Sequence, residues 1–480
     1  MESSDKKNFN LDIDPAITGI SRRTINNIIK VWQESSNAFP VISPDISDEE
    51  KLIVIQLIDD CIKEEGGEIS RRTKVVHLAM IYINLNKSGK EKFLKILAHE
   101  FDVDILSLDE KIHNLQAAKN DEEKIKSELL LRDALIPPRV LFLRQLITLP
   151  NGFIFLKDMR CDLLTMIKSA PRLKKLSDDI KMLLVTYFDV NLLDLKEVTW
   201  ESPASMLEKL MEYEAVHEIN SWKELKHRLF TDHRVFAFFH NRMCNDPLIF
   251  VEVALVKGMS DNIQKLIDVN VKPGNPYEAD TAIFYSISST QKGLEGISFG
   301  NFLIKRVVKK LTAQFENIKT FATLSPVPMF RNWLGNYIKN NGNCFFKSDE
   351  EKNIIKISKN KNASEGLLEI LNFENWYDDS NIADKIKFPL MRLCAHYLFN
   401  VKRNDDPNRA LDPVANFHLS NGAKIEHIHW LADISKRGMK QSAGIMLNYH
   451  YRLDKIAINH ENYMTKGNLH ASSAAKAWLS

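Results

Sequence analysis

The pattern of apolar residues changes near residue 195, and this change constrains the fold class most strongly. Before it, apolar residues recur at the i, i+3, i+4 spacing of amphipathic helices, and glycines are few. After Trp200, short apolar runs with the length of strands alternate with helical segments. We therefore expect an all-helical domain over residues 1–195, followed by an α+β or α/β domain over 196–480, in which helices flank a mixed sheet.

The first part contains six segments with helical periodicity. The sequence around Ser47 has a small polar residue ahead of acidic ones, which is typical of a helix start. The pair Pro137-Pro138 predicts a helix boundary, because proline disfavours a preceding helical residue. We expect helices at 22–37, 48–65, 70–85, 89–101, 107–131 and 174–188.

The second part contains the strands. The apolar and β-branched runs predict strands at 235–239, 248–256, 281–288, 319–325 and 446–453. A strand, a crossover helix and a second strand indicate a βαβ unit around residues 281–325. Helical patterns lie near 329–339, 364–373 and 386–401, and we expect the polar stretch 341–365 to be a surface excursion.

Charge and cysteine content exclude several classes of protein. The 480 residues contain 65 Lys and Arg against 63 Asp and Glu, so a net charge of +2 gives no basic field for nucleic acid. The five cysteines are isolated, which favours reduced thiols over disulfides or a zinc site. Neither a membrane-spanning run nor a targeting peptide is evident, so we expect a cytoplasmic protein without a membrane partner.

A glycine-rich loop follows the strand at 281–288 and leads directly into an amphipathic helix. Its glycines are Gly293, Gly296 and Gly300, and the helix has a core stripe of Leu303, Val307, Leu311 and Phe315. Glycines let backbone N–H groups approach an anion, and a helix N-terminus carries a partial positive charge. The spacing is neither that of a dinucleotide fold nor that of a P-loop, and it resembles the pyrophosphate loop of GNAT-type acetyltransferases.

Two polar residues, Ser325 and His418, are candidate catalytic residues. Ser325 ends a predicted strand, and ligands bind where the carboxyl ends of neighbouring strands open. His418 lies in a polar stretch and has a side chain that exchanges protons near neutral pH. Each could instead be a cap or a packed core residue. His427 and His429, with Glu426, suggest a metal pair, but no further ligand pattern accompanies them, and we expect no metal.

Taken together, these segments resemble the malonyl-CoA decarboxylase family over most of the chain. The family has a helical N-terminal domain and a GNAT-like catalytic domain, and it forms homo-oligomers through the helical domain, so a dimer or tetramer is implied. The segments that carry the resemblance are Leu131–Arg139, Met159–Leu164, Val198–Pro203, Glu214–His217, Phe284–Ser288, Phe302–Val308, Leu324–Pro328 and Asp412–Gly422.

The resemblance also implies site residues. Ser325 and His418 match the family's catalytic pair and contact the substrate, and Lys209 and Asn421 match positions that support activity. No metal or organic cofactor is implied, since coenzyme A is part of the substrate. The residues of the implied coenzyme A loop are Glu295, Gly296, Ile297, Ser298, Phe299, Gly300 and Asn301.

The expected reaction converts malonyl-CoA to acetyl-CoA and CO2 within fatty acid metabolism. Loss of CO2 leaves a thioester enolate, which needs hydrogen-bond donors at its oxygen and a proton for its carbon. Two alternatives share the same loop. One is a GNAT-type acyltransferase that moves an acyl group from coenzyme A to an amine, and the other is a non-catalytic assembly module that binds coenzyme A.

Overall fold

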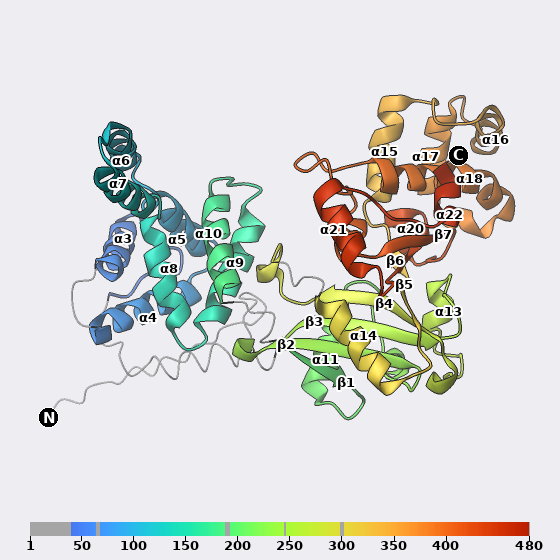
Figure 1. Cartoon of the computed structure of the whole chain (residues 1–480), viewed down its shortest axis with the longest axis horizontal. Helices are drawn as coiled ribbons and strands as arrows, with labels where there is room; N and C mark the ends of the chain where they lie inside the picture. Colours follow the sequence, from blue (N-terminus) through green and yellow to red (C-terminus); the bar gives the residue numbers. More distant parts are fainter. Residues whose placement is uncertain (1–39, 64–67, 188–192, 244–245, 298–301, 480) are drawn as a thin grey trace. The chain divides into compact units, whose positions relative to one another are not determined.

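The structure is a computed structural model of the chain, and it describes residues 40–63, 68–187, 193–243, 246–297 and 302–479 (Figure 1). The chain forms two compact units. The first contains Met1–Leu192 with two later segments, His240–Cys244 and Gln291–Ser298. The second contains the remainder, so the two halves of the chain divide between residues 192 and 193.

The first unit is helical in its described part, apart from its turns. Its core is formed by apolar side chains such as Leu94, Phe142, Leu156 and Leu176, each of which is fully buried. The helices are α3 (Asp48–Ile62), α4 (Glu68–Asn84), α5 (Lys87–His99), α6 (Ile105–Ala117), α7 (Asp121–Ala134), α8 (Pro138–Thr148), α9 (Gly152–Met166) and α10 (Leu173–Thr186).

Local sequence signals account for several of these helix ends. Ser47 caps α3, which confirms the predicted helix start, and its side chain and that of Glu50 form a reciprocal capping box. Helix α8 begins at Pro138, which confirms the predicted boundary. The single helix expected over 107–131 is wrong, because Asn120 caps a new helix by accepting from the Glu123 N–H at 2.9 Å. The segment 22–37 lies outside the described residues.

The second unit is built on a mixed sheet, which confirms the predicted fold class. The described strands run in the order β1-β2-β3-β4-β5-β8-β6, and β7 also pairs with β8. Strands β4 and β5 are parallel, as expected for a βαβ unit, whereas the pairs β2–β3, β3–β4, β5–β8, β6–β8 and β7–β8 are antiparallel. The strands are β1 (Leu193–Val198), β2 (His233–His240), β3 (Pro247–Val256), β4 (Thr281–Ser289), β5 (Thr320–Thr323), β6 (Ser325–Pro326), β7 (Lys424–His429) and β8 (Met446–His450).

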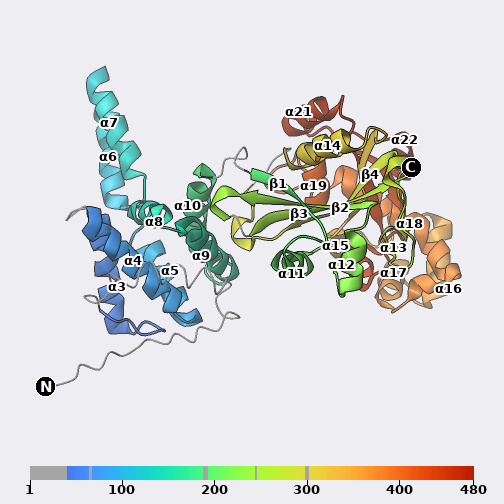
Figure 2. The same cartoon turned by 90° about the horizontal axis from the view of Figure 1, so that it is seen from below.

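Helices cover both faces of this sheet. Val235, Ala237 and Phe239 of β2 pack with residues of α11 (Ala204–Tyr213) and α12 (Trp222–Arg228). The alternate residues Phe236 and Phe238 lie under Lys310 and Arg306 of α14 (Phe302–Gln314). This alternation is the two-residue period of a strand that is buried on both faces, and Figure 2 shows α14 and α11 on opposite sides.

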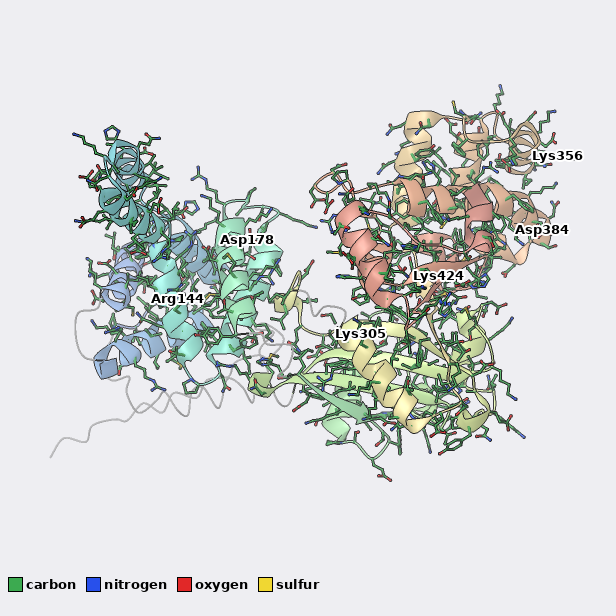
Figure 3. The ribbon with its side chains drawn as sticks, in the orientation of Figure 1. Arg144, Asp178, Lys305, Lys356, Asp384 and Lys424 are labelled. Carbon is green, nitrogen blue, oxygen red and sulfur yellow. The ribbon has the colours of Figure 1, made fainter. Side chains whose placement is uncertain are left out.

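Helix α14 follows its predicted pattern. Its four stripe residues are buried, so the apolar face of the helix packs on the sheet. Lys305 of the same helix is exposed and projects from the surface (Figure 3). Arg306 and Lys310 of this helix are only partly solvated, because they lie over Phe238 and Phe236 of β2.

A group of helices follows β6 in the chain. The stretch 341–365 lies largely at the surface, as expected, but it contains α16 (Ser348–Ser358) and the first residues of α17 (Ala363–Asn372), which were not predicted. Glu350 of α16 is held by Arg392 of α18, whose two terminal nitrogens donate to it at 2.9 and 2.5 Å. The remaining helices include α13 (Ile263–Ile267), α15 (Phe330–Asn341), α16 (Ser348–Ser358), α17 (Ala363–Asn372), α18 (Ser380–Asn400), α19 (Pro413–Ser420), α20 (Lys436–Ser442), α21 (Ile456–Lys466) and α22 (Ser473–Lys476). Across the described ranges, no helix combines the length and the apolar character needed to cross a bilayer.

Candidate active site

Ser325 lies where the chain leaves β5 and begins β6. Leu324 still donates to the Phe284 carbonyl of β4, and Ser325 then pairs with Leu447 of β8. The side chains of Thr323 and Ser325 are two residues apart, and the Ser325 Oγ donates to the Thr323 Oγ1 at 2.9 Å. Ser325 is buried but retains 6% of its surface. The hydroxyl is therefore fixed at the end of a strand, as the sequence indicated.

His418 lies near the end of α19, and both ends of this helix are fixed by the local sequence. Asp412 caps its start by accepting from the Val414 and Ala415 N–H groups, each at 3.0 Å. The chain turns away at Gly422, which has a φ of 83° and leaves no room for a Cβ beside the Ile456 carbonyl. The His418 imidazole is thus carried by a short helix whose start is fixed by Asp412 and whose end is fixed at Gly422.

The structure brings Ser325 and His418 together. The Nε2 of His418 lies 3.0 Å from the Ser325 Oγ, although 93 positions separate the two residues. The Nδ1 of His418 lies 2.7 Å from the hydroxyl of Tyr451, and the Tyr449 ring stacks on the imidazole at 4.5 Å. Neither tyrosine was predicted as a site residue, although their alternation at the end of a predicted strand places Tyr449 and Tyr451 on one face.

These contacts form one directed chain of hydrogen bonds. Because Ser325 gives its proton to Thr323, its Oγ accepts from the Nε2–H of His418. A neutral imidazole has one donor and one acceptor, so Nδ1 accepts from the Tyr451 hydroxyl. The Thr323 Oγ1 also accepts from the Tyr449 N–H at 3.1 Å. His418 therefore carries its proton on the nitrogen that faces Ser325.

Burial determines the protonation states around the pair. His418 is 3% exposed, and burial lowers its pKa to about 3, so the imidazole is neutral near pH 7. Burial raises the pKa of Tyr451 well above its usual value. Burial also raises the pKa of the Asp412 carboxyl to about 6, although the backbone donors of α19 counteract this shift. The pair thus lies in a water-poor environment where hydrogen bonds to developing charge are strong.

The described part of the implied coenzyme A loop belongs to the first unit, whereas Ser325 and His418 belong to the second. Glu295, Gly296 and Ile297 follow a short 3-10 turn, Lys292–Leu294. Gly296 has a φ of 75°, which favours glycine. The remaining predicted loop residues, Ser298, Phe299, Gly300 and Asn301, lie outside the described residues.

The two positions expected to support activity have structural partners. The Nζ of Lys209 on α11 forms an ion pair with Asp246 at 2.5 Å. The side-chain amide of Asn421 donates to the Phe417 carbonyl at 2.8 Å and so closes the C-terminus of α19. Asn421 therefore fixes the helix that carries His418, whereas the ion pair of Lys209 joins α11 to the start of β3.

The two histidines of β7 make contacts with each other and with the neighbouring strand. His427 and His429 share a face of the strand, with ring centroids 5.7 Å apart. The Nε2 of His429 lies 2.6 Å from the side-chain oxygen of Asn448 on β8, and Glu426 pairs with Lys424 at 2.7 Å. Over the described ranges, no three His, Cys, Asp or Glu side chains gather in a way that could hold a metal ion.

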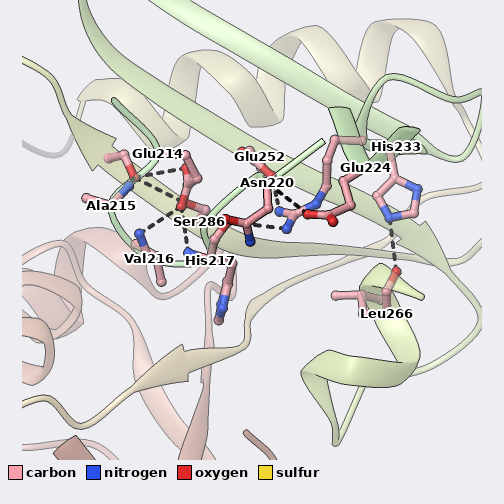
Figure 4. A network of polar contacts seen from close by, with 12 residues as sticks. Glu214, Ala215, Val216, His217, Asn220, Glu224, His233, Glu252, Leu266 and Ser286 are labelled. Carbon is pink, nitrogen blue, oxygen red and sulfur yellow. Dashed lines mark hydrogen bonds and ion pairs between the residues drawn. The ribbon is translucent and has the colours of Figure 1, made fainter. Parts of the chain in front are cut away.

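A second buried polar network lies beside β4 (Figure 4). The Glu214 carboxylate accepts from the Ser286 hydroxyl at 2.7 Å and from the Ser288 hydroxyl at 3.0 Å. It also accepts from the backbone N–H groups of Val216 and His217, each at 2.8 Å. The network ties the loop after α11 to β4.

Comparisons with known proteins give the family of this chain. Residues 191–480 match the family model described as the malonyl-CoA decarboxylase C-terminal domain, and residues 101–188 match that of its N-terminal domain. The chain is 34% identical over 410 residues to the mitochondrial malonyl-CoA decarboxylase of Anser anser anser, covering 82% of this chain and 80% of that protein. For the enzyme of Rattus norvegicus the identity is 36%, with 72% of each chain covered.

Solved structures give the same result. The malonyl-CoA decarboxylase of Rhodopseudomonas palustris superposes with a TM-score of 0.80 at 37% identity, covering 89% of this chain and 99% of that one. The enzyme of Agrobacterium vitis superposes with a TM-score of 0.78 at 36% identity, covering 89% and 100%. Two family models, similarity over most of the sequence and a shared fold lead to one conclusion: the chain belongs to the malonyl-CoA decarboxylase family.

Proposed function

We propose that this chain is a carboxy-lyase that converts malonyl-CoA to acetyl-CoA and CO2. The observation that supports this function most strongly is the 3.0 Å contact between His418 Nε2 and Ser325 Oγ in a member of this family. The carbon–carbon bond to the carboxylate breaks, CO2 leaves, and the electron pair remains on the thioester as an enolate. One proton then completes acetyl-CoA.

The proposed role of Ser325 is to hydrogen-bond the reacting malonyl group, and that of His418 is to supply the proton. A neutral donor suits this reaction, because a fixed cation would stabilise the charged ground state as well as the transition state. Burial keeps His418 neutral, and its Nε2–H faces the Ser325 oxygen. The proton can therefore pass to the enolate carbon from His418 itself or through the serine hydroxyl, and the imidazole regains one proton from solvent in each turnover, which replaces the proton consumed when malonyl-CoA becomes acetyl-CoA and CO2.

We assign the loop that contains Glu295–Ile297 to coenzyme A, and we propose that the reaction needs neither a metal nor an organic cofactor. The positive φ of Gly296 supports the first assignment. The second follows from the chemistry, since the thioester itself accepts the electron pair. A cytoplasmic location stays a prediction from the sequence.

An assay with malonyl-CoA as the only organic substrate tests this function. Purified protein in buffer with a metal chelator should release one acetyl-CoA for each CO2. An acyltransferase would leave the malonyl-CoA largely unchanged without an amine acceptor, and a binding module would retain coenzyme A without turnover. Either result would contradict the proposal, as would activity that requires added metal.

We also propose that the chain forms a dimer or tetramer through its helical unit. Helices α6 and α7 pack on each other, yet neither has a buried residue. Leu106 is 82% exposed and Ile125 is 59% exposed, so a large apolar surface would be covered by a second copy.

Light scattering should give a mass at least twice the 55.3 kDa of the chain. Replacing Leu106 and Ile125 by Glu should reduce that mass, and a monomeric wild type would contradict the proposal.

A further inference from the structure

Arg160 of α9 holds the loop 291–297 by its backbone. Its Nη1 donates to the Gly293 carbonyl at 2.6 Å and its Nη2 to the Glu295 carbonyl at 2.8 Å. The Nε faces the Ser177 carbonyl at 3.3 Å, and Arg160 is only 4% exposed. A buried guanidinium needs partners, and here all three are backbone carbonyls rather than carboxylates. Arg160 therefore fixes the course of the loop.

Lys157, one turn earlier on α9, fixes the start of the same loop. Its Nζ donates to the side-chain oxygen of Gln291 at 2.8 Å. Gly293 approaches α9 so closely that a Cβ there would overlap the Lys157 carbonyl oxygen. Gln291 and Gly293 therefore both contact α9 directly. These contacts explain why the segment Gln291–Ser298 belongs to the helical unit.

The orientation of the loop peptides follows from these contacts. The Glu295 carbonyl points at Arg160, and the N–H of a trans peptide points opposite to its carbonyl. The N–H of Gly296 is therefore directed away from Arg160. The Leu294 and Glu295 N–H groups are used within the loop, since they donate to the Gln291 and Lys292 carbonyls. The carbonyl oxygens of Gly293 and Glu295, which would repel an anion, thus face Arg160. The Gly296 N–H points in the opposite direction from the Glu295 carbonyl and is not used by Arg160.

A cation lies close to Gly296. The Nζ of Lys181 on α10 is 3.3 Å from the position that a Cβ on Gly296 would occupy. Lys181 is half-buried, and within the described part of the chain it forms no ion pair. Two carboxylates lie nearby and are exposed: those of Glu295 and Asp178 interact electrostatically with Arg160, and Asp178 projects from α10 (Figure 3).

We propose that α9 and α10 form part of the site that binds the phosphates of the acyl-CoA. Lys181 and the Gly296 N–H contact a phosphate oxygen, and Arg160 is a positioning residue that holds the loop in the binding conformation. The ligand class is a nucleotide diphosphate joined to pantetheine, and this identification rests on the proposed function. The helical unit then contributes to substrate affinity as well as to assembly.

The first test replaces Lys181 by Ala and measures two substrates, malonyl-CoA and malonyl-pantetheine, which lacks the nucleotide and its phosphates. Loss of one charged contact should raise the KM for malonyl-CoA by about 10-fold, with a much smaller effect on kcat. The KM for malonyl-pantetheine should not change. Lys175→Ala is the matched control, because Lys175 lies on the same helix, is exposed and pairs with Asp102. An equal change for both substrates, or none for either, would overturn the proposal.

The second test replaces Arg160 by Gln and measures the Kd for coenzyme A by calorimetry, which needs no turnover. The Kd should rise by about 10-fold or more. Arg160→Lys should restore only part of the affinity, since an ammonium cannot serve both carbonyls in the same way. Arg139→Gln is the control, because Arg139 is a buried arginine of the same unit that pairs with Asp102 and Asp179. Wild-type affinity for coenzyme A in folded Arg160→Gln protein would refute the positioning role. If that variant fails to fold, the Lys181→Ala measurements with malonyl-CoA and malonyl-pantetheine decide whether the phosphate site exists.

Binding and turnover separate this inference from the proposed function. If wild-type protein binds coenzyme A but does not decarboxylate malonyl-CoA, the proposed function fails and the phosphate site stands. If it decarboxylates malonyl-CoA while Lys181→Ala behaves like wild type toward both substrates, the phosphate site fails and the function stands.

Discussion

Replacing His418 by Ala should lower the turnover of malonyl-CoA by at least about 100-fold, because a positioned acid contributes roughly 10²–10⁴ in rate. The variant removes the group whose Nε2–H faces Ser325 and leaves the enolate to be protonated by water. It also removes the ring that stacks on Tyr449, so circular dichroism should confirm folding before rates are compared. Ser325→Ala should have an effect of the same order.

A matched control is available on β7. His427 is also partly buried in the second unit, but its ring neighbour is His429 rather than Ser325. His427→Ala should retain near-normal turnover. If His418→Ala does so as well, the proposed role of His418 is wrong.

The second large effect concerns stability. Replacing Arg228 by Met should reduce the free energy of unfolding of the second unit by about 3–5 kcal/mol, since removing one member of a buried ion pair leaves the other buried without its partner. The Nη1 of Arg228 donates to the Glu252 carboxylate at 2.7 Å, and the two side chains are 3% and 0% exposed. Burial raises the pKa of Glu252 to about 7, although Arg228 counteracts this shift. Glu252 would therefore take up a proton in the variant.

A double variant separates the charge from the packing. Arg228→Met with Glu252→Leu should recover most of the lost stability, because replacing both members of a buried pair by apolar residues is often neutral. Urea denaturation of the wild type, both single variants and the double variant measures the coupling. If the single Arg228 variant is as stable as the wild type, or the double variant loses the sum of both single effects, this account of the pair is wrong.

Periodicity predicted about half of the helices and strands, and two of its errors have causes that the structure shows. The break between α6 and α7 depends on one capping side chain, Asn120, inside an otherwise helical pattern. Helix α16 was not predicted because its apolar face is narrow, with Ile354 as its buried residue. Its position instead depends on the ion pair between Glu350 and Arg392, which are 42 positions apart. Such long-range partners are not encoded in local spacing.

The site could be predicted only in part. Ser325 and His418 were identified from their strand and segment context and from the resemblance, and the structure places them in contact. Tyr451 was missed because a tyrosine at a strand end has no signature until its hydroxyl is seen 2.7 Å from the imidazole. Arg160 was missed for a similar reason, since its three carbonyl partners come from distant backbone.

The most direct test of the central claim is a comparison of kcat/KM for malonyl-CoA in Ser325→Ala, His418→Ala and the double variant. If the two side chains act as one unit, the double variant should lose no more than a few-fold beyond the more damaging single variant, because residues that act together are strongly non-additive. Multiplied losses would show two independent contributions and contradict the hydrogen-bonded pair as the functional unit.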